Sequence, residues 1–183
     1  MFTRYKGEGK ILFPTVRTKE SVMKGMVIYK SWWGSCKRIA EAIGKGLSET
    51  GHDVRVVAIE DAGKPDASLD FIVIGAATRW PGAWPKIKRH AKKIIRAGFD
   101  GKPFAAFSTG GSVNTGEQLR QASEVLHEML EAGGLVALAP PFIAAIEGYK
   151  APGRGEDRGF LPESEVARAE EFGRELGGKL SNP

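Results

Sequence analysis

The chain has 183 residues, which suffices for one well-buried domain and is too short for two of ordinary size. Its net charge is +5, and its single cysteine excludes an internal disulfide framework and a cysteine-based metal cluster. The three histidines show no ligand spacing, and no apolar run is long enough to cross a bilayer. We therefore expect a cytoplasmic protein with no bound metal and no membrane span.

Residues 1–25 precede the regular pattern of the chain and are basic in balance. We interpret them as an N-terminal appendage or extension. Residues 26–183 then form one domain.

Short apolar runs alternate, from residue 26 onward, with segments whose apolar residues recur at helical spacing. The runs predict five strands, at residues 26–29, 54–59, 71–75, 103–107 and 135–138. Helical segments separate most of these strands, and another ends the chain. Residues 61–69 are too broken by Gly63 and Pro65 to predict a helix, and residues 139–162 form a Pro/Gly-rich connection.

Five apolar strands separated by helices predict a parallel sheet, because parallel neighbours need crossover connections. Right-handed crossovers place helices on both faces. The expected fold is therefore a doubly wound α/β domain with a five-stranded parallel sheet. Ligands of such domains bind outside the carboxyl ends of the strands, where the loops after strands one, three and four meet.

The first of these loops, residues 31–36, has the sequence Ser-Trp-Trp-Gly-Ser-Cys and leads into a helix. The first amides of a helix have no internal partner and carry the positive end of its dipole, so this turn can hold a phosphate. The alternative is that Ser31 and Ser35 only cap the helix.

Three loops together resemble those of the flavodoxin family. Residues 31–36 are similar to its phosphate loop, Ser/Thr-x-x-Gly-Asn-Thr. Residues 75–85, Gly-Ala-Ala-Thr-Arg-Trp-Pro-Gly-Ala-Trp-Pro, resemble its Gly-Ser-Pro-Thr-Tyr-x-Gly-x-x-Pro segment. Residues 107–112, Phe-Ser-Thr-Gly-Gly-Ser, resemble its Phe-Gly-Thr-Gly-Gly segment. The three motifs occur in the family's order, and the resemblance spans residues 26–180.

This resemblance implies non-covalently bound FMN, with no catalytic side chain and no metal. Trp80 is the residue expected to stack on the flavin ring, with Trp32, Trp33 and Trp84 as alternatives to it or as plain core residues. The implied contacts come from all three loops: Ser31, Trp32, Trp33, Gly34, Ser35, Cys36, Ala77, Thr78, Arg79, Trp80, Gly82, Ser108, Thr109, Gly110, Gly111 and Ser112.

The loops also depart from the family pattern. Ser35 stands for asparagine, Cys36 for threonine and Ala77 for proline, while Arg79 resembles the quinone- and porphyrinogen-oxidising branches. The main hypothesis is an FMN-binding electron-transfer protein. The alternatives are an NAD(P)H-dependent oxidoreductase on the same fold and an interaction module that has lost the flavin.

Cys36 occupies the first turn of the predicted helix. A thiol there tends to have a lowered pKa, since the amides favour the thiolate. We therefore expect a reactive thiol that bound FMN protects. The alternative is a small buried hydrophobic residue.

A basic stripe runs along the second predicted helical segment, where residues 86–96 contain no acid: Lys86, Lys88, Arg89, Lys92, Lys93 and Arg96. One interpretation is an ordinary solvated face. The functional interpretation is a docking surface for an acidic redox partner, because such a field speeds encounter. A nucleic-acid partner is not expected, because the sequence has no recognition motif.

Overall fold

The computed structural model describes residues 22–78, 83–111, 120–149 and 158–182, and the statements below concern these residues. Strand β1 starts at Lys24, two residues before the predicted domain boundary. The elements in chain order are β1 (Lys24–Lys30), α1 (Ser35–Glu49), β2 (Asp53–Ala58), β3 (Phe71–Ala77), α2 (Pro85–Arg96), β4 (Pro103–Gly111), α3 (Ala122–Glu131), β5 (Val136–Ala137), β6 (Phe142–Tyr149), β7 (Arg158–Phe160) and α4 (Glu163–Ser181).

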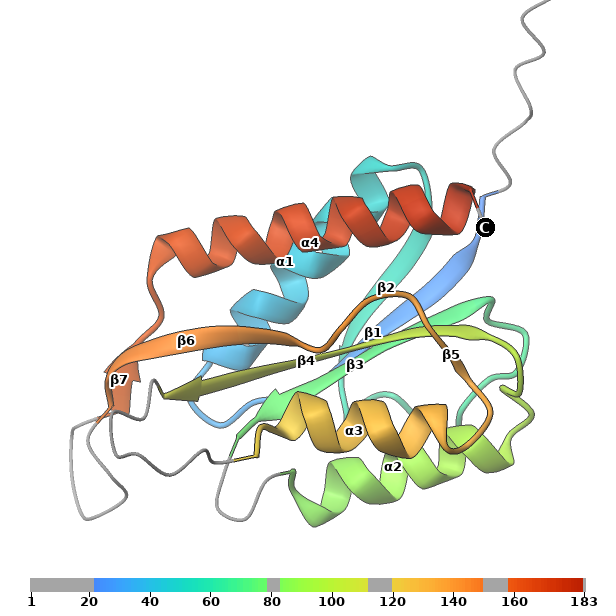
Figure 1. Ribbon diagram of the computed structural model, residues 1–183, viewed down its shortest axis with the longest axis horizontal. Coiled ribbons are helices and arrows are strands. Elements are labelled where there is room, and N and C mark those ends of the chain that lie inside the picture. The colour runs from blue at the N-terminus through green and yellow to red at the C-terminus, as the bar shows by residue number, and fades with distance from the viewer. Residues whose placement is uncertain (1–21, 79–82, 112–119, 150–157, 183) are drawn as a thin grey trace, which may run out of the picture.

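The sheet has the order β2-β1-β3-β4-β6-β7, and β5 pairs with the start of β4. Every pair is parallel except β6 with β7, which is antiparallel. Helices α1 and α4 lie against one face of the sheet, and α2 and α3 lie against the other (Figure 1). The predicted doubly wound α/β fold is confirmed, with β7 as an additional antiparallel strand.

The fifth parallel position of the sheet is shared by β5 and β6. Val136 lies beside Pro103 of β4, and further along the same strand Phe142 lies beside Phe107. Pro140 and Pro141 interrupt the pairing, because proline cannot donate to a ladder. The prediction of an irregular connection at 139–162 was wrong in its described parts, which contain β6, β7 and the start of the turn into α4.

No helix forms between β2 and β3, as the sequence predicted for residues 61–69. The segment 59–70 is held as a loop instead. Lys102 donates hydrogen bonds to the carbonyl oxygens of Ala67 and Leu69, the latter at 2.7 Å. One stretch of sheet beside α2 is therefore covered by a loop, which leaves room at that place.

Two glycines let α1 and α4 approach each other closely on the opposite face. A Cβ on Gly46 would lie 2.1 Å from the carbonyl oxygen of Glu170, and one on Gly173 would lie 2.3 Å from that of Ile43. Backbone packing at this distance admits no side chain. This contact fixes α1, and therefore its N-terminus, relative to the sheet.

The part of β6 that β7 does not pair is covered by α4. Glu165 accepts a hydrogen bond from the backbone N–H of Ala145 at 3.1 Å, and Arg168 donates to the carbonyl oxygen of Ile143. These contacts occupy edge groups that would otherwise be open to strand pairing. Within the described ranges, no helix has the length and apolar character to cross a membrane.

Candidate functional site

The carboxyl ends of β1, β3 and β4 lie at the same edge of the sheet, so the loops after these strands begin there (Figure 1). The contacts described below tie the loops together. Four predicted site residues, Arg79, Trp80, Gly82 and Ser112, lie outside the described residues.

The first loop ends in a turn that opens α1. Gly34 is the N-cap with a φ of +91°, a conformation that glycine adopts without strain. Its N–H donates to Ser31 Oγ at 3.1 Å, and its carbonyl accepts the N–H of Arg38 at 3.0 Å. The Ser31 hydroxyl therefore shapes the turn.

The N-terminus of α1 carries the positive end of the helix dipole, and no acidic side chain of α1 neutralises it. Its first turn contains no acidic residue, and Gly34 has no side chain that could cap the helix. A Cβ at Gly34 would meet no atom within 4 Å among the described residues. Open space and helix-terminal amides together make this turn suitable for an anion.

Two tryptophans flank this turn at the surface. Trp32 and Trp33 are 51% and 48% exposed, so the interpretation of these two residues as core is wrong. The Trp32 ring lies 5.0 Å from that of Trp84, at an interplanar angle of 33°. Because Trp84 precedes α2, this contact joins the first loop to the second and forms an aromatic surface beside the α1 terminus.

Thr78 joins the second loop to the third and to α3. Its N–H donates to the carbonyl oxygen of Thr109 at 2.7 Å, which continues the pairing of β3 with β4 beyond Ala77. Its hydroxyl donates to Gln121 Oε1 at 2.8 Å and accepts the N–H of Ala122 at 3.0 Å. The Thr78 side chain thus holds the start of α3.

Gln121 is a residue of this region that the sequence analysis missed. It is the N-cap of α3 and forms a capping box with Glu124, whose carboxylate accepts the N–H of Gln121 at 2.6 Å. A Cβ on Gly110 would lie 2.3 Å from Gln121 Oε1. Gly110 therefore makes room for the Gln121 side chain. In the sequence, the three-residue spacing of Gln121 and Glu124 was the pattern that could have indicated the capping box.

Three predicted site residues turn their side chains inward. Ser108 and Ser123 share a buried hydrogen bond of 2.8 Å between their hydroxyl oxygens. Thr109 is 4% exposed, and its side chain hydrogen-bonds the buried Cys36 thiol. These side chains support the loops from within the domain, and Gly111 ends β4 beside them.

The thiol of Cys36 differs from the reactive group that the sequence analysis favoured. The side chain is fully buried, and this burial raises the pKa of the Cys36 thiol far above its usual range, while the hydrogen bond with Thr109 acts in the opposite direction. The thiol form is therefore the stable one. The alternative of a small buried hydrophobic residue is correct.

Comparison with known proteins gives the family and the fold of the chain. Residues 27–151 match the model of the family described as Flavodoxin. A flavodoxin from the domain Archaea superimposes with a TM-score of 0.71 at 20% identity, covering 87% of this chain and 100% of the other. Flavodoxin 1 from Bacillus cereus gives 0.65 at 21% identity, with 84% and 96% covered.

The same fold also occurs as one portion of a longer protein. The Flv1 flavodiiron core from Synechocystis sp. PCC6803 has a TM-score of 0.68 at 16% identity, covering 87% of this chain but 36% of that one. No curated protein sequence matches the chain. At these identities the solved structures establish the fold, and the family model establishes the membership.

Proposed function

Because this chain belongs to the flavodoxin family, whose members bind FMN, we propose that it is an electron carrier that holds FMN at the three loops and exchanges electrons with a redox partner protein. The main support for this proposal is that the N-terminus of α1, which has no acidic residue in its first turn, lies next to the exposed Trp32 and Trp33. When bound, FMN supplies the redox chemistry, and the protein supplies binding and orientation.

The phosphate is assigned to the turn at Gly34. The amides of Ser35 and Cys36 belong to the first turn of α1, where helix N–H groups have no intrahelical acceptor. The positive φ of Gly34 and the open space at its missing Cβ allow close approach of an anion. Ser35 contributes its hydroxyl under this proposal, whereas Cys36 contributes only its backbone.

The ring of the flavin is assigned to the aromatic surface beside this turn. Trp32 is held by its contact with Trp84, and Lys30 Nζ lies 5.6 Å from the centre of the Trp32 ring. Half-exposed tryptophans give a planar cofactor a large apolar contact. The main chain at Gly110 and Gly111, at the end of β4, is assigned to the polar edge of the ring.

A carrier fits these loops better than an enzyme with its own acid–base groups. The described loop residues, 31–34, 78, 83 and 84, include neither a carboxylic acid nor a histidine, and the Cys36 thiol is buried. The alternative of an NAD(P)H-dependent oxidoreductase depends on Arg79, which lies outside the described residues. Family membership also leaves the flavin-free module without support.

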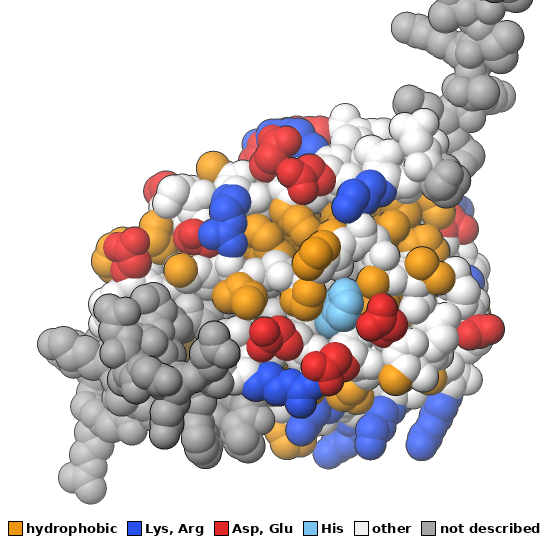
Figure 2. Space-filling model, in the orientation of Figure 1, with side chains coloured by type: hydrophobic (Ala, Val, Ile, Leu, Met, Phe, Trp, Pro, Cys, Tyr) orange, Lys and Arg blue, Asp and Glu red, His pale blue; other side chains and the backbone are white. Residues whose placement is uncertain are grey.

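We assign partner docking to the outward face of α2. Five cations of this helix are exposed and none of its residues is an acid: Lys86, Arg89, Lys92, Lys93 and Arg96. Lys and Arg side chains extend from the side of the molecule where α2 lies (Figure 2). An acidic partner fits this field, because complementary charge speeds encounter.

Steady-state kinetics separate the carrier from the oxidoreductase. The FMN-loaded protein is mixed with NADH or NADPH and a quinone. We expect no turnover above that of free FMN until a flavodoxin reductase is added. Sustained turnover by the protein alone would assign it to the enzyme class.

A further inference from the structure

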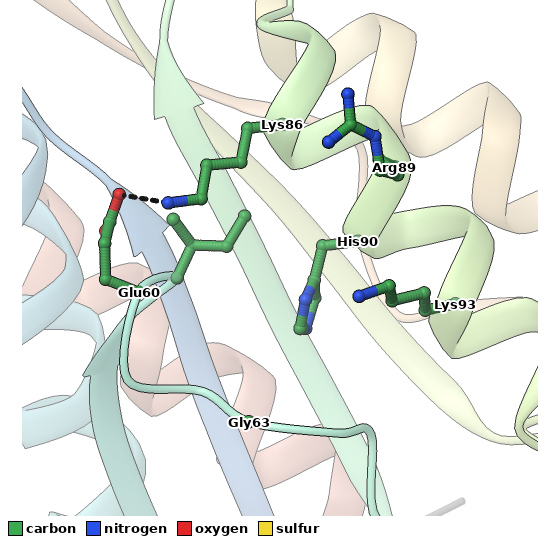
Figure 3. A pocket seen from close by; sticks show the side chains of 7 residues that line it. Glu60, Gly63, Lys86, Arg89, His90 and Lys93 are labelled. Atoms are coloured by element: carbon green, nitrogen blue, oxygen red, sulfur yellow. Dashed lines mark hydrogen bonds and ion pairs between the residues drawn. The ribbon is translucent and has the colours of Figure 1, made fainter.

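A cavity of about 240 Å³ lies between α2 and the loop that follows β2 (Figure 3). The cavity lies beside the connection between β2 and β3, which forms a loop instead of a helix. None of its lining residues belongs to the three loops of the FMN site. The lining consists of Ile59, Glu60, Gly63, Lys86, Arg89, His90 and Lys93.

The cavity has an excess of positive charge. Partial burial acts to raise the pKa of Glu60, but hydrogen bonds from Lys30 at 2.5 Å and Lys86 at 2.9 Å outweigh it and lower that pKa to about 2. Glu60 is therefore an anion already paired with two cations. Arg89 and Lys93 form no ion pair with any residue that the structure describes, so their charges remain available.

His90 brings an unsatisfied polar atom to the same place. Its residue surface is only 6% exposed, and its Nε2 has no hydrogen-bond partner within the described part of the chain. The ring points from α2 into the cavity, beside Lys93 (Figure 3). A buried nitrogen without a partner is costly, and a ligand in the cavity would supply the missing bond.

The neutral form of His90 can donate a hydrogen bond to an anion. Burial lowers the pKa of His90, and the nearby Lys93 lowers it further. The other charged groups at the ring are Lys86 and Arg89 on α2 and Glu60 across the cavity. The ring is therefore neutral near pH 7, where the tautomer with Nε2–H donates one hydrogen bond.

We propose that this cavity binds a phosphate group through Arg89, Lys93 and the Nε2–H of His90. A guanidinium and an ammonium match a phosphate dianion in charge, and the guanidinium can donate two parallel hydrogen bonds. The volume lies below the roughly 300 Å³ at which pockets for drug-sized ligands begin, which favours a small anion or the phosphorylated end of a ligand. Lys102 holds the far end of the opposite wall by its bonds to Ala67 and Leu69.

The test uses FMN-loaded protein, so that the turn at Gly34 is occupied, and titrates inorganic phosphate at constant ionic strength. Ring spectra of the three histidines by NMR report the site. We expect a saturable shift of His90 and a rise in its titration midpoint, because a bound anion favours the protonated ring. His52, whose Nε2 contacts the Gly177 carbonyl at 3.0 Å, and His127 on α3 should not respond.

Calorimetry on variants then assigns the donors. Arg89→Gln should weaken phosphate binding about tenfold, whereas Lys92→Gln, on the same helix but outside the cavity, should change it less than about twofold. His90→Phe should abolish the heat of binding without lowering the melting temperature in phosphate-free buffer, because it removes an unsatisfied nitrogen. FMN occupancy should be equal in all variants.

Glycerol 3-phosphate, titrated in parallel, distinguishes the source of the phosphate. Equal affinities assign the site to the free ion, and tighter binding of the ester assigns it to an organic phosphate. The proposal is overturned if the three histidines shift alike, if chloride or acetate binds as well as phosphate, or if Lys92→Gln weakens binding as much as Arg89→Gln. None of these outcomes bears on FMN binding.

Discussion

The hydroxyl of Thr78, just beyond the end of β3, accepts a hydrogen bond from the backbone N–H of Ala122, the first residue of α3, at 3.0 Å. It also donates to Gln121 Oε1 at 2.8 Å. Thr78 and Ala122 are 44 positions apart in the sequence. One side chain of the second loop therefore bonds to the first N–H of the helix that follows the third loop.

Thr78→Val should remove both hydrogen bonds while keeping the shape of the side chain. We expect a loss of about 1–2 kcal/mol in the free energy of unfolding, because a helix-terminal N–H and an amide oxygen lose a partner. Urea unfolding of the apoprotein measures it. Thr78→Ser retains the hydroxyl and should cost less than half as much; an equal loss in both variants would show that the methyl group matters instead.

The structure predicts a slowly reacting Cys36 thiol, whereas its position at the start of a helix favoured a reactive one. Because the thiol is fully buried and its pKa is raised by that burial, iodoacetamide should alkylate it slowly with and without FMN. Mass spectrometry of the native protein follows the reaction, and protein unfolded in urea is the positive control. Rapid alkylation of the folded apoprotein would contradict the structure at this turn.

The sequence predicted the loops at the sheet edge better than the side chains within them. Loop order and strand order follow from apolar runs, which are local patterns. The inward direction of Cys36 follows from a helical stripe that it shares with Ile39, Ala40 and Ile43, all buried on α1. That stripe was visible in the spacing, but the helix-terminal position of the cysteine suggested a different role.

Other features could not be read from local patterns. The alternating buried residues Phe142, Ala144 and Ile146 mark β6, yet Pro140 and Pro141 just before them read as a loop. Likewise, the contact of Thr78 with Gln121 depends on the parallel pairing of β3 with β4, which brings distant segments together. Tertiary contacts of this kind have no signature in a single sequence.

Glu60 should make stability depend on pH in the acid range. Its pKa is about 2 in the folded protein, below the usual 4.5, so its pairing stabilises the fold above pH 4.5 and is lost as the pH falls toward 2. The side chain is 41% exposed, so solvent limits the effect to about 1 kcal/mol or less. The stability difference between wild type and Glu60→Gln, measured by urea unfolding from pH 6 to pH 3, should shrink toward the acid end. A constant difference would show that the ion pairs do not contribute.

The α2 face should govern the rate of electron transfer to an acidic partner. Reversing one charge of this face, by Lys92→Glu, which does not line the cavity beside His90, should slow the reaction about threefold at low salt and little at high salt, where the charges are screened. Arg55→Glu on β2, also exposed, is the control for a change of net charge. Stopped-flow kinetics with the purified partner measures the rates. An equal effect of Arg55→Glu would make the α2 face an ordinary solvated surface.

Comparison of FMN with riboflavin tests whether the phosphate binds at the turn formed by Gly34. Both are titrated into apoprotein, and quenching of flavin fluorescence gives the dissociation constants. FMN should bind about a hundredfold more tightly or better, since riboflavin leaves the oriented amides of α1 without an anion. Equal dissociation constants for the two flavins would show that the phosphate does not bind at this turn.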